Sequence, residues 1–121
     1  MNQNEVIKLA VSSLDDKKAK NIKVLKIDEL TSLAEYFIIA TATSSVHVRS
    51  LADEVEAKLE ESGCKPHHIE GKTTGWIVLD YESVIIHIFT PDQREFYGLD
   101  RMWNDAKEID VTSFIENFKE D

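Results

Sequence analysis

The chain has 121 residues, of which 42% are hydrophobic and 31% are charged, and its formal net charge at pH 7 is −9. This length allows one hydrophobic core and excludes two domains of ordinary size. The acidic balance argues against direct binding to nucleic acid, which depends on basic side chains, and favours a partner protein with a basic surface.

Targeting signals and disulfide bonds are not expected. No apolar run approaches the length of a membrane span, and residues 1–5 lack the basic start and apolar centre of a signal peptide. The single cysteine, Cys64, excludes an internal disulfide and fits a reducing compartment. We therefore expect a cytoplasmic protein that has no membrane partner.

The first half of the chain predicts two helices and two strands. Residues 4–20 carry apolar side chains at helical spacing, and residues 22–27 form a moderate strand. Residues 36–40 are apolar throughout, which is typical of a central strand covered on both faces. A second helix follows, with an apolar stripe at helical spacing, and ends at Gly63.

The second half predicts an edge strand, a hairpin and a short helix. Residues 65–70 include a proline and suit an edge strand, and β-branched residues in 76–80 and 84–90 predict a hairpin. Residues 90–93 have the pattern of a capping-box helix start with proline at the first helical position. Gly98 then ends this helix after about two turns.

The chain after Asn104 is acidic, yet it also carries apolar residues at helical spacing. They predict a last helix capped by Asp110 or Thr112, and they are Val111, Phe114, Ile115 and Phe118. The order of elements predicts an α/β fold, a single-domain sandwich with a mixed sheet of about five strands and flanking helices. We divide the chain into a domain of residues 1–105 and an acidic C-terminal tail of residues 106–121.

Catalytic and metal sites find little support in the sequence. Cys64, His67 and His68 lie close together, but a tetrahedral zinc site needs four suitably directed ligands. The turn at residues 41–45 could bind a phosphate at a helix start, but the paired carboxylates that hold magnesium in nucleotidyltransferases are missing. We therefore predict no catalytic residue, no metal, no cofactor and no enzymatic activity. His87, inside an apolar strand, is predicted to be a hydrogen-bonded histidine of the core or the sheet edge.

The predicted hairpin offers a candidate binding face. Strand alternation places Ile77 and Leu79 on the core face and Trp76, Val78 and Asp80 on the other. This puts an indole and a carboxylate side by side, a combination that suits a partner presenting Arg or Lys. Alternatively, the C-terminal helix covers Trp76.

The segment from Glu70 to Trp103 resembles the ribosomal silencing factor family, the bacterial relatives of the plant Iojap protein. The residues that carry the resemblance are Glu70, Gly71, Trp76, Asp80, Val84, His87, Phe89 and the run from Arg94 to Trp103, with an upstream match at residues 36–41, Ser44, Ser45 and His47. Together they span roughly residues 5 to 105. Ala42 and the turn at Glu82 and Ser83 depart from the family, which usually has glycine there. Because residues with a Cβ resist positive φ, we expect those turns to differ in type from the family's.

The resemblance implies a fold related to nucleotidyltransferases without their catalytic carboxylates. It implies a protein that binds the large ribosomal subunit through its protein number fourteen, sterically blocks association with the small subunit and represses translation when nutrients are short. It also implies self-association as a homodimer. The binding residues it implies are Glu70, Trp76, Asp80, Arg94, Glu95, Tyr97, Leu99, Asp100, Met102 and Trp103. Two alternatives stay open, a nucleotide-binding or nucleotidyltransferase-like enzyme and an assembly factor for the large subunit.

Overall fold

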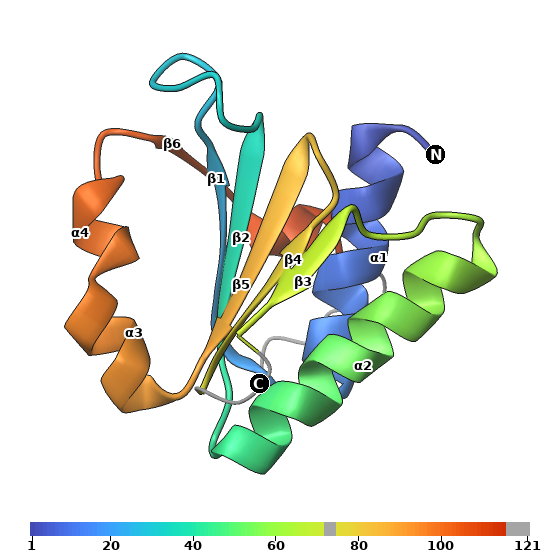
Figure 1. The fold of residues 1–121 in the computed structure, drawn as a ribbon. Helices are drawn as coiled ribbons and strands as arrows, with labels where there is room; N and C mark the ends of the chain where they lie inside the picture. Colours follow the sequence, from blue (N-terminus) through green and yellow to red (C-terminus); the bar gives the residue numbers. More distant parts are fainter. Residues whose placement is uncertain (72–74, 116–121) are drawn as a thin grey trace.

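One mixed sheet of six strands organises the chain (Figure 1). The computed structural model describes residues 1–71 and 75–115. The strands lie in the order β3 (His68–Glu70), β4 (Trp76–Asp80), β5 (Val84–Phe89), β2 (Tyr36–Thr41), β1 (Lys20–Lys26) and β6 (Lys107–Ile109). Only the β2–β5 pair is parallel among these neighbours. The predicted mixed α/β architecture is confirmed, with six strands where about five were expected.

Two long helices, α1 (Gln3–Asp16) and α2 (Ser45–Glu61), cover one face of the sheet (Figure 1). The side chain of Asn2 caps α1 in a reciprocal capping box with Glu5. Ser44 caps α2 by accepting a hydrogen bond from the amide of His47. Both helices end within four residues of their predicted ends.

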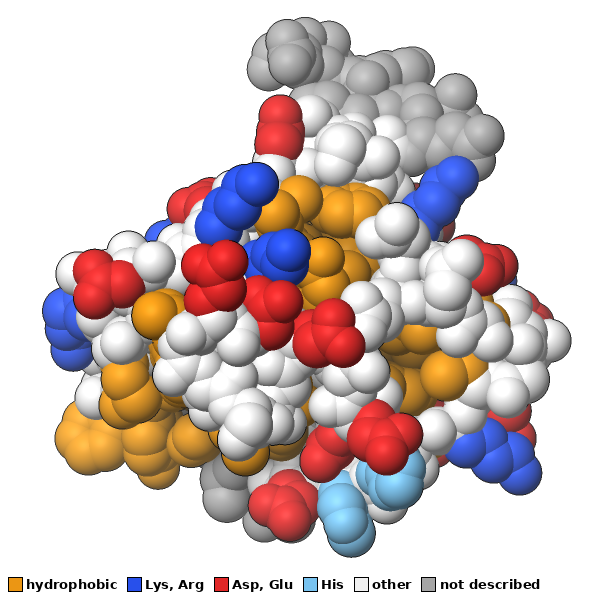
Figure 2. Space-filling view, turned by 90° about the horizontal axis from the view of Figure 1, so that it is seen from above, with side chains coloured by type: hydrophobic (Ala, Val, Ile, Leu, Met, Phe, Trp, Pro, Cys, Tyr) orange, Lys and Arg blue, Asp and Glu red, His pale blue; other side chains and the backbone are white. Residues whose placement is uncertain are grey.

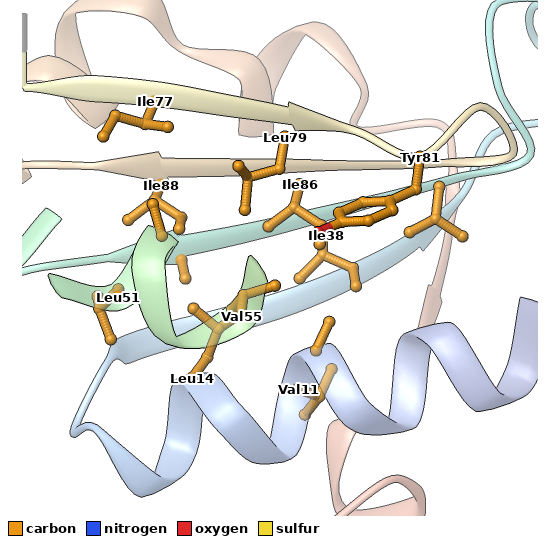
Figure 3. Packing of buried hydrophobic residues seen from close by; sticks show 14 of the residues in the cluster. Val11, Leu14, Ile38, Leu51, Val55, Ile77, Leu79, Tyr81, Ile86 and Ile88 are labelled. Carbon is orange, nitrogen blue, oxygen red and sulfur yellow. The ribbon is translucent and has the colours of Figure 1, made fainter. Parts of the chain in front are cut away.

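The larger core lies between these helices and the sheet (Figure 3). Its members alternate along the strands and recur at helical spacing, and they include Val11, Leu14, Ile38, Leu51, Val55, Ile77, Leu79, Ile86 and Ile88. Each of these side chains is nearly or fully inaccessible to solvent. The prediction that Ile77 and Leu79 face the core is therefore confirmed.

Two short helices, α3 (Pro91–Tyr97) and α4 (Leu99–Met102), lie on the opposite face of the sheet (Figure 1). A second, smaller core forms there from Leu25, Ile27, Ala34, Phe37, Ile39, Ile85, Phe89 and Leu99. Strands β2 and β5 are thus buried on both faces, as the continuous apolar run at residues 36–40 predicts.

The start of α3 differs from the prediction in one respect. Pro91 occupies the first turn, but the side chain of Thr90 makes no capping hydrogen bond. The capping-box prediction is wrong because the amide of Thr90 donates to the carbonyl of Gly75, which leaves no free amide for Gln93. The predicted end is confirmed, because Gly98 adopts left-handed angles with φ 61°.

The hairpin turn keeps a left-handed residue without using glycine. Glu82 has φ 73°, and its amide donates to a carboxylate oxygen of Asp80 at 2.8 Å. This hydrogen bond compensates part of the strain of a positive φ in a residue that has a Cβ.

The described part of the C-terminal segment belongs to the sheet. Strand β6 pairs antiparallel with β1, and Asp110 caps a single 3-10 turn, η1 (Val111–Ser113). Val111, Phe114 and Ile115 then pack against the larger core. The prediction of an α-helix behind Asp110 is wrong for the described residues, while Phe118 and loop residues 72–74 lie outside them. In the described part of the chain, no helix is long and apolar enough to cross a membrane.

Candidate protein-interaction surface

The predicted binding residues lie on or beside the sheet face that carries α3 and α4. In the antiparallel register, Glu70 opposes Val78 and Val78 opposes His87. Opposed residues project from the same face of a sheet. Glu70, Trp76, Val78 and Asp80 therefore share a face with His87, and this face is opposite to α1 and α2.

Trp76 is half-buried within an aromatic group. Its ring stacks on Phe89 with centroids 4.9 Å apart, and Tyr97 of α3 lies at a centroid distance of 4.4 Å. The indole Nε1–H donates a hydrogen bond to Nδ1 of His87 at 3.2 Å. Helix α3 thus covers part of Trp76, and the side chain as a whole is half-buried.

His87 forms the buried wall behind Trp76. It is 7% exposed and packs edge-on against Phe37 at a centroid distance of 4.7 Å. Burial lowers the pKa of His87 to about 4, so its imidazole is neutral at pH 7. Because Nδ1 accepts from Trp76, the ring proton lies on Nε2. The prediction of a hydrogen-bonded core histidine is confirmed.

Three large apolar side chains project from α3 and α4 into solvent. Met102 is 66% exposed, Tyr97 43% and Phe96 76%. Phe96 contacts Tyr97 with ring centroids 5.1 Å apart and is absent from the predicted binding residues. Figure 2 shows hydrophobic side chains gathered on the side of the molecule where α3 and α4 lie, with acidic side chains nearby. A seven-residue helix can turn only one side toward the sheet. In α3 this side carries Arg94 and Tyr97, which are three residues apart, and Phe96 therefore points outward.

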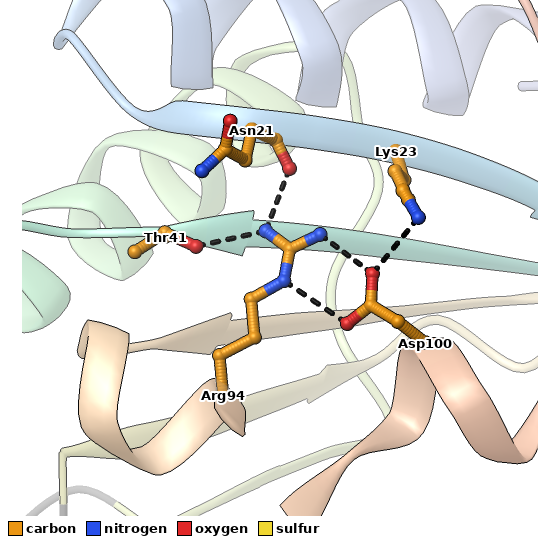
Figure 4. A network of polar contacts seen from close by, with 5 residues as sticks. All are labelled: Asn21, Lys23, Thr41, Arg94 and Asp100. Carbon is orange, nitrogen blue, oxygen red and sulfur yellow. Dashed lines mark hydrogen bonds and ion pairs between the residues drawn. The ribbon is translucent and has the colours of Figure 1, made fainter.

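Two predicted binding residues, Arg94 and Asp100, face each other between the short helices and the sheet, and their side chains are 12% and 26% exposed (Figure 4). Nε and Nη2 of Arg94 donate to the two carboxylate oxygens of Asp100 at 3.1 and 2.9 Å. Nη1 of Arg94 donates to the carbonyl of Asn21 at 2.6 Å and to Oγ1 of Thr41 at 2.8 Å. Nζ of Lys23 lies 3.2 Å from Asp100. Hydrogen bonds from Arg94 lower the pKa of the Asp100 carboxyl to about 2.

The remaining predicted residues divide between surface and interior. Glu70 and Glu95 are exposed, while Leu99 is buried in the smaller core. Trp103 is half-buried against Phe37, with ring centroids 5.3 Å apart. Asp80 is half-exposed near the end of β4.

The carboxylate of Asp80 does not lie beside the indole of Trp76. Val78 separates them on the same face, and residues four apart in a strand are about 13 Å apart. The expectation that the two groups are adjacent is therefore wrong, because next neighbours on one strand face are only two residues apart in sequence. They provide two separate points of contact on one face.

The alternative chemical sites gain no support from the described residues. Among residues 1–71 and 75–115, no group of three His, Cys, Asp or Glu side chains is placed to hold a metal ion. In the turn before α2, the amide of Thr43 donates to Nδ1 of His47, and the amide of His47 donates to Ser44. These two amides at the helix start are therefore occupied by side chains of the protein itself.

The chain is similar to known proteins over most of its length. The model of the family described as "Ribosomal silencing factor during starvation" matches residues 1–121. The ribosomal silencing factor RsfS of Bacillus subtilis is 32% identical over 112 residues, which cover 92% of this chain and 95% of that protein. A crystal structure of a protein from Chromobacterium violaceum has a TM-score of 0.83 at 35% identity and covers 86% of this chain and 88% of that one. The Mus musculus protein named mitochondrial assembly of ribosomal large subunit protein 1 is 30% identical over 101 residues, which are 80% of this chain and 44% of that protein.

Proposed function

The chain belongs to the ribosomal silencing factor family, and on this premise we propose that it binds the large ribosomal subunit through its protein number fourteen. The bound protein sterically blocks association with the small subunit and represses translation under nutrient limitation. It acts in the cytoplasm by occupying a surface, and this mechanism requires no chemical step.

The α3–α4 surface carries this proposal. We define it as the exposed or half-exposed residues Glu70, Trp76, Asp80, Glu95, Phe96, Tyr97, Met102 and Trp103. Its aromatic side chains are large anchors that a partner can desolvate, since Trp and Tyr are enriched at the energetic centres of interfaces. Phe96 and Met102 are more exposed than folding alone favours, and a protein partner would cover them.

The charge of this surface suits a basic ribosomal protein. Glu70, Asp80 and Glu95 add negative charge around the aromatic side chains, and the whole chain carries −9. The positive charge of Arg94 is balanced by Asp100 and does not oppose these groups. Acidic groups of this kind steer a protein onto a basic patch and raise the association rate.

A role in assembly of the large subunit is a second candidate. It is supported by the similarity to the mouse protein whose name states that role. An assembly factor would use the same contact while the large subunit is still being assembled. Self-association through Phe96, Tyr97 and Met102 would compete with both roles, because it would bury the same side chains.

The first experiment is co-sedimentation of the purified protein with isolated large subunits. We expect the wild-type protein to pellet with the subunits and Trp76→Ala and Asp80→Lys to bind at least tenfold more weakly. Glu61→Lys is the matched control, because it makes the same charge reversal at the far end of α2 and should bind normally. Circular dichroism checks that each variant is folded. If the wild-type protein fails to pellet at moderate salt, the proposed function is wrong.

A further inference from the structure

The helices that present the α3–α4 surface are too short to be stable alone. Helix α3 has seven residues and α4 has four, whereas isolated helices shorter than about 12 residues are marginal in water. No residue of α3 is buried, and Leu99 is the buried residue of α4. The placement of both helices therefore depends on a few specific contacts with the sheet.

Arg94 supplies the most extensive of the polar contacts. Its guanidinium starts on α3 and reaches β1 at Asn21, β2 at Thr41 and α4 at Asp100 (Figure 4). The side chain is only 12% exposed, so solvent screens these charge-assisted hydrogen bonds weakly. One residue thus fixes α3 and α4 to each other and to two central strands.

The backbone around Arg94 is shaped to receive it. The β1–β2 register shifts between Lys20 and Lys23, and Asn21 within this bulge has φ 49°. Bulges re-aim backbone groups, and here the carbonyl of Asn21 accepts from Arg94 at 2.6 Å. On the other side, the left-handed angles of Gly98 turn the chain so that Asp100 faces back toward α3. Both irregularities serve the same network.

We propose that Arg94 and Asp100 are positioning residues that hold the α3–α4 surface in its binding geometry and do not themselves contact the ribosomal protein. This inference rests on the proposed function and revises the role of two residues that the family resemblance places in the interface. Asp100 also forms an ion pair with Lys23 of β1, and this contact ties α4 to β1 directly. A partner touching the surface would meet Phe96, Tyr97 and Met102 first, because these side chains project outward.

The direction in which Arg94→Gln changes the affinity for the partner distinguishes a positioning role from a contact role. If both residues contacted a basic partner, Asp100→Asn would weaken binding and Arg94→Gln would strengthen it, because an opposing positive charge is removed. If they position the surface, both variants weaken binding. The change should be about tenfold for each, as expected for loss of a charge-assisted hydrogen-bonded pair.

The test measures co-sedimentation of Arg94→Gln, Asp100→Asn and the double variant with large subunits over a range of protein concentrations. We expect the double variant to bind large subunits no more weakly than whichever single variant has the lower affinity, because both substitutions break the same pair. Arg94→Lys should also weaken binding, since lysine keeps the charge but lacks the planar fork. Arg49→Gln is the matched control, because Arg49 is an exposed arginine of α2, on the other face of the sheet, and its loss should leave binding unchanged.

Hydrogen exchange on the same variants reports on the fold independently of the ribosome. We expect faster amide exchange in residues 91–103 and unchanged exchange in the central strands. Opposite effects of Arg94→Gln and Asp100→Asn on binding, or unchanged exchange in residues 91–103, would overturn the positioning role. Wild-type protein that fails to bind would instead overturn the proposed function, and the exchange result would still decide whether the pair holds α3 and α4.

Discussion

The buried imidazole of His87 should make the stability of the protein depend on pH. Its pKa is about 4 in the folded chain, compared with 6.5 for an ordinary histidine. Between these values the unfolded chain binds a proton that the folded chain does not, so the free energy of unfolding falls as the pH decreases. Between pH 7 and pH 5 the expected loss is about 2 kcal/mol. Asp100 titrates at lower pH and contributes little in this window.

The variant His87→Phe isolates this effect. Phenylalanine does not titrate and has the size and shape to pack against Phe37 and Phe89, which flank His87 on the same sheet face. It removes the acceptor for Trp76, but that loss lowers stability equally at both pH values. The other three histidines are common to both proteins, so their contributions cancel in the comparison.

Urea unfolding followed by far-UV circular dichroism at pH 7 and pH 5 measures the difference. The wild-type protein should lose about 2 kcal/mol more than His87→Phe on acidification, a change of about twentyfold in the folding equilibrium. Equal losses in the two proteins would refute the reasoning. They would mean that His87 takes up its proton in the folded state as readily as in the unfolded chain.

Two further predictions concern the exposed surface and the C-terminal segment. Phe96→Ala should weaken binding to large subunits at least tenfold. It should not lower the thermal midpoint of unfolding, because the side chain is 76% exposed. The control Val46→Ala, at an 80% exposed position of α2, should change neither the affinity nor the thermal midpoint. A protein that ends at Asp105 lacks β6 and the apolar contacts of Val111 and Phe114, and its free energy of unfolding should fall by roughly 2 kcal/mol or more in urea. An unchanged urea midpoint would show that the segment after Asp105 is dispensable for the fold.

Most of the fold follows from local patterns in the sequence. The apolar stripes of α1 and α2 are long enough to reveal a helical period, and β4 and β5 are recognisable from their β-branched residues. Strand β6 escapes this reasoning because it has three residues, two of them exposed and charged. What makes it a strand is its pairing with β1, a contact between segments about 80 residues apart.

The capping of α3 fails as a prediction for a related reason. The residue types around Thr90 fit a capping box, and local propensity gives no cause to doubt it. A capping box needs the backbone amide of Thr90 to be free for the side chain of Gln93. This amide instead donates to the carbonyl of Gly75, which lies beside Thr90 because β4 pairs with β5. Tertiary pairing thus overrides a local signal, and only the folded chain shows it.

The run from Arg94 to Trp103 contains two kinds of residue that look alike in sequence. A charged residue in a short acidic and aromatic motif suggests a contact with a partner, and Glu95 is exposed, as such a contact requires. Arg94 and Asp100 are six residues apart on either side of Gly98, and a continuous helix would not place their side chains together. The left-handed angles of Gly98 bring the two side chains together as a bidentate pair. The backbone turn at this glycine therefore determines that Arg94 and Asp100 pair with each other. On the proposed function, we therefore expect a family motif of this kind to combine residues that contact the partner with residues that hold the surface in place. Hydrogen bonds within the chain, such as those of Arg94 and Asp100, mark the second kind.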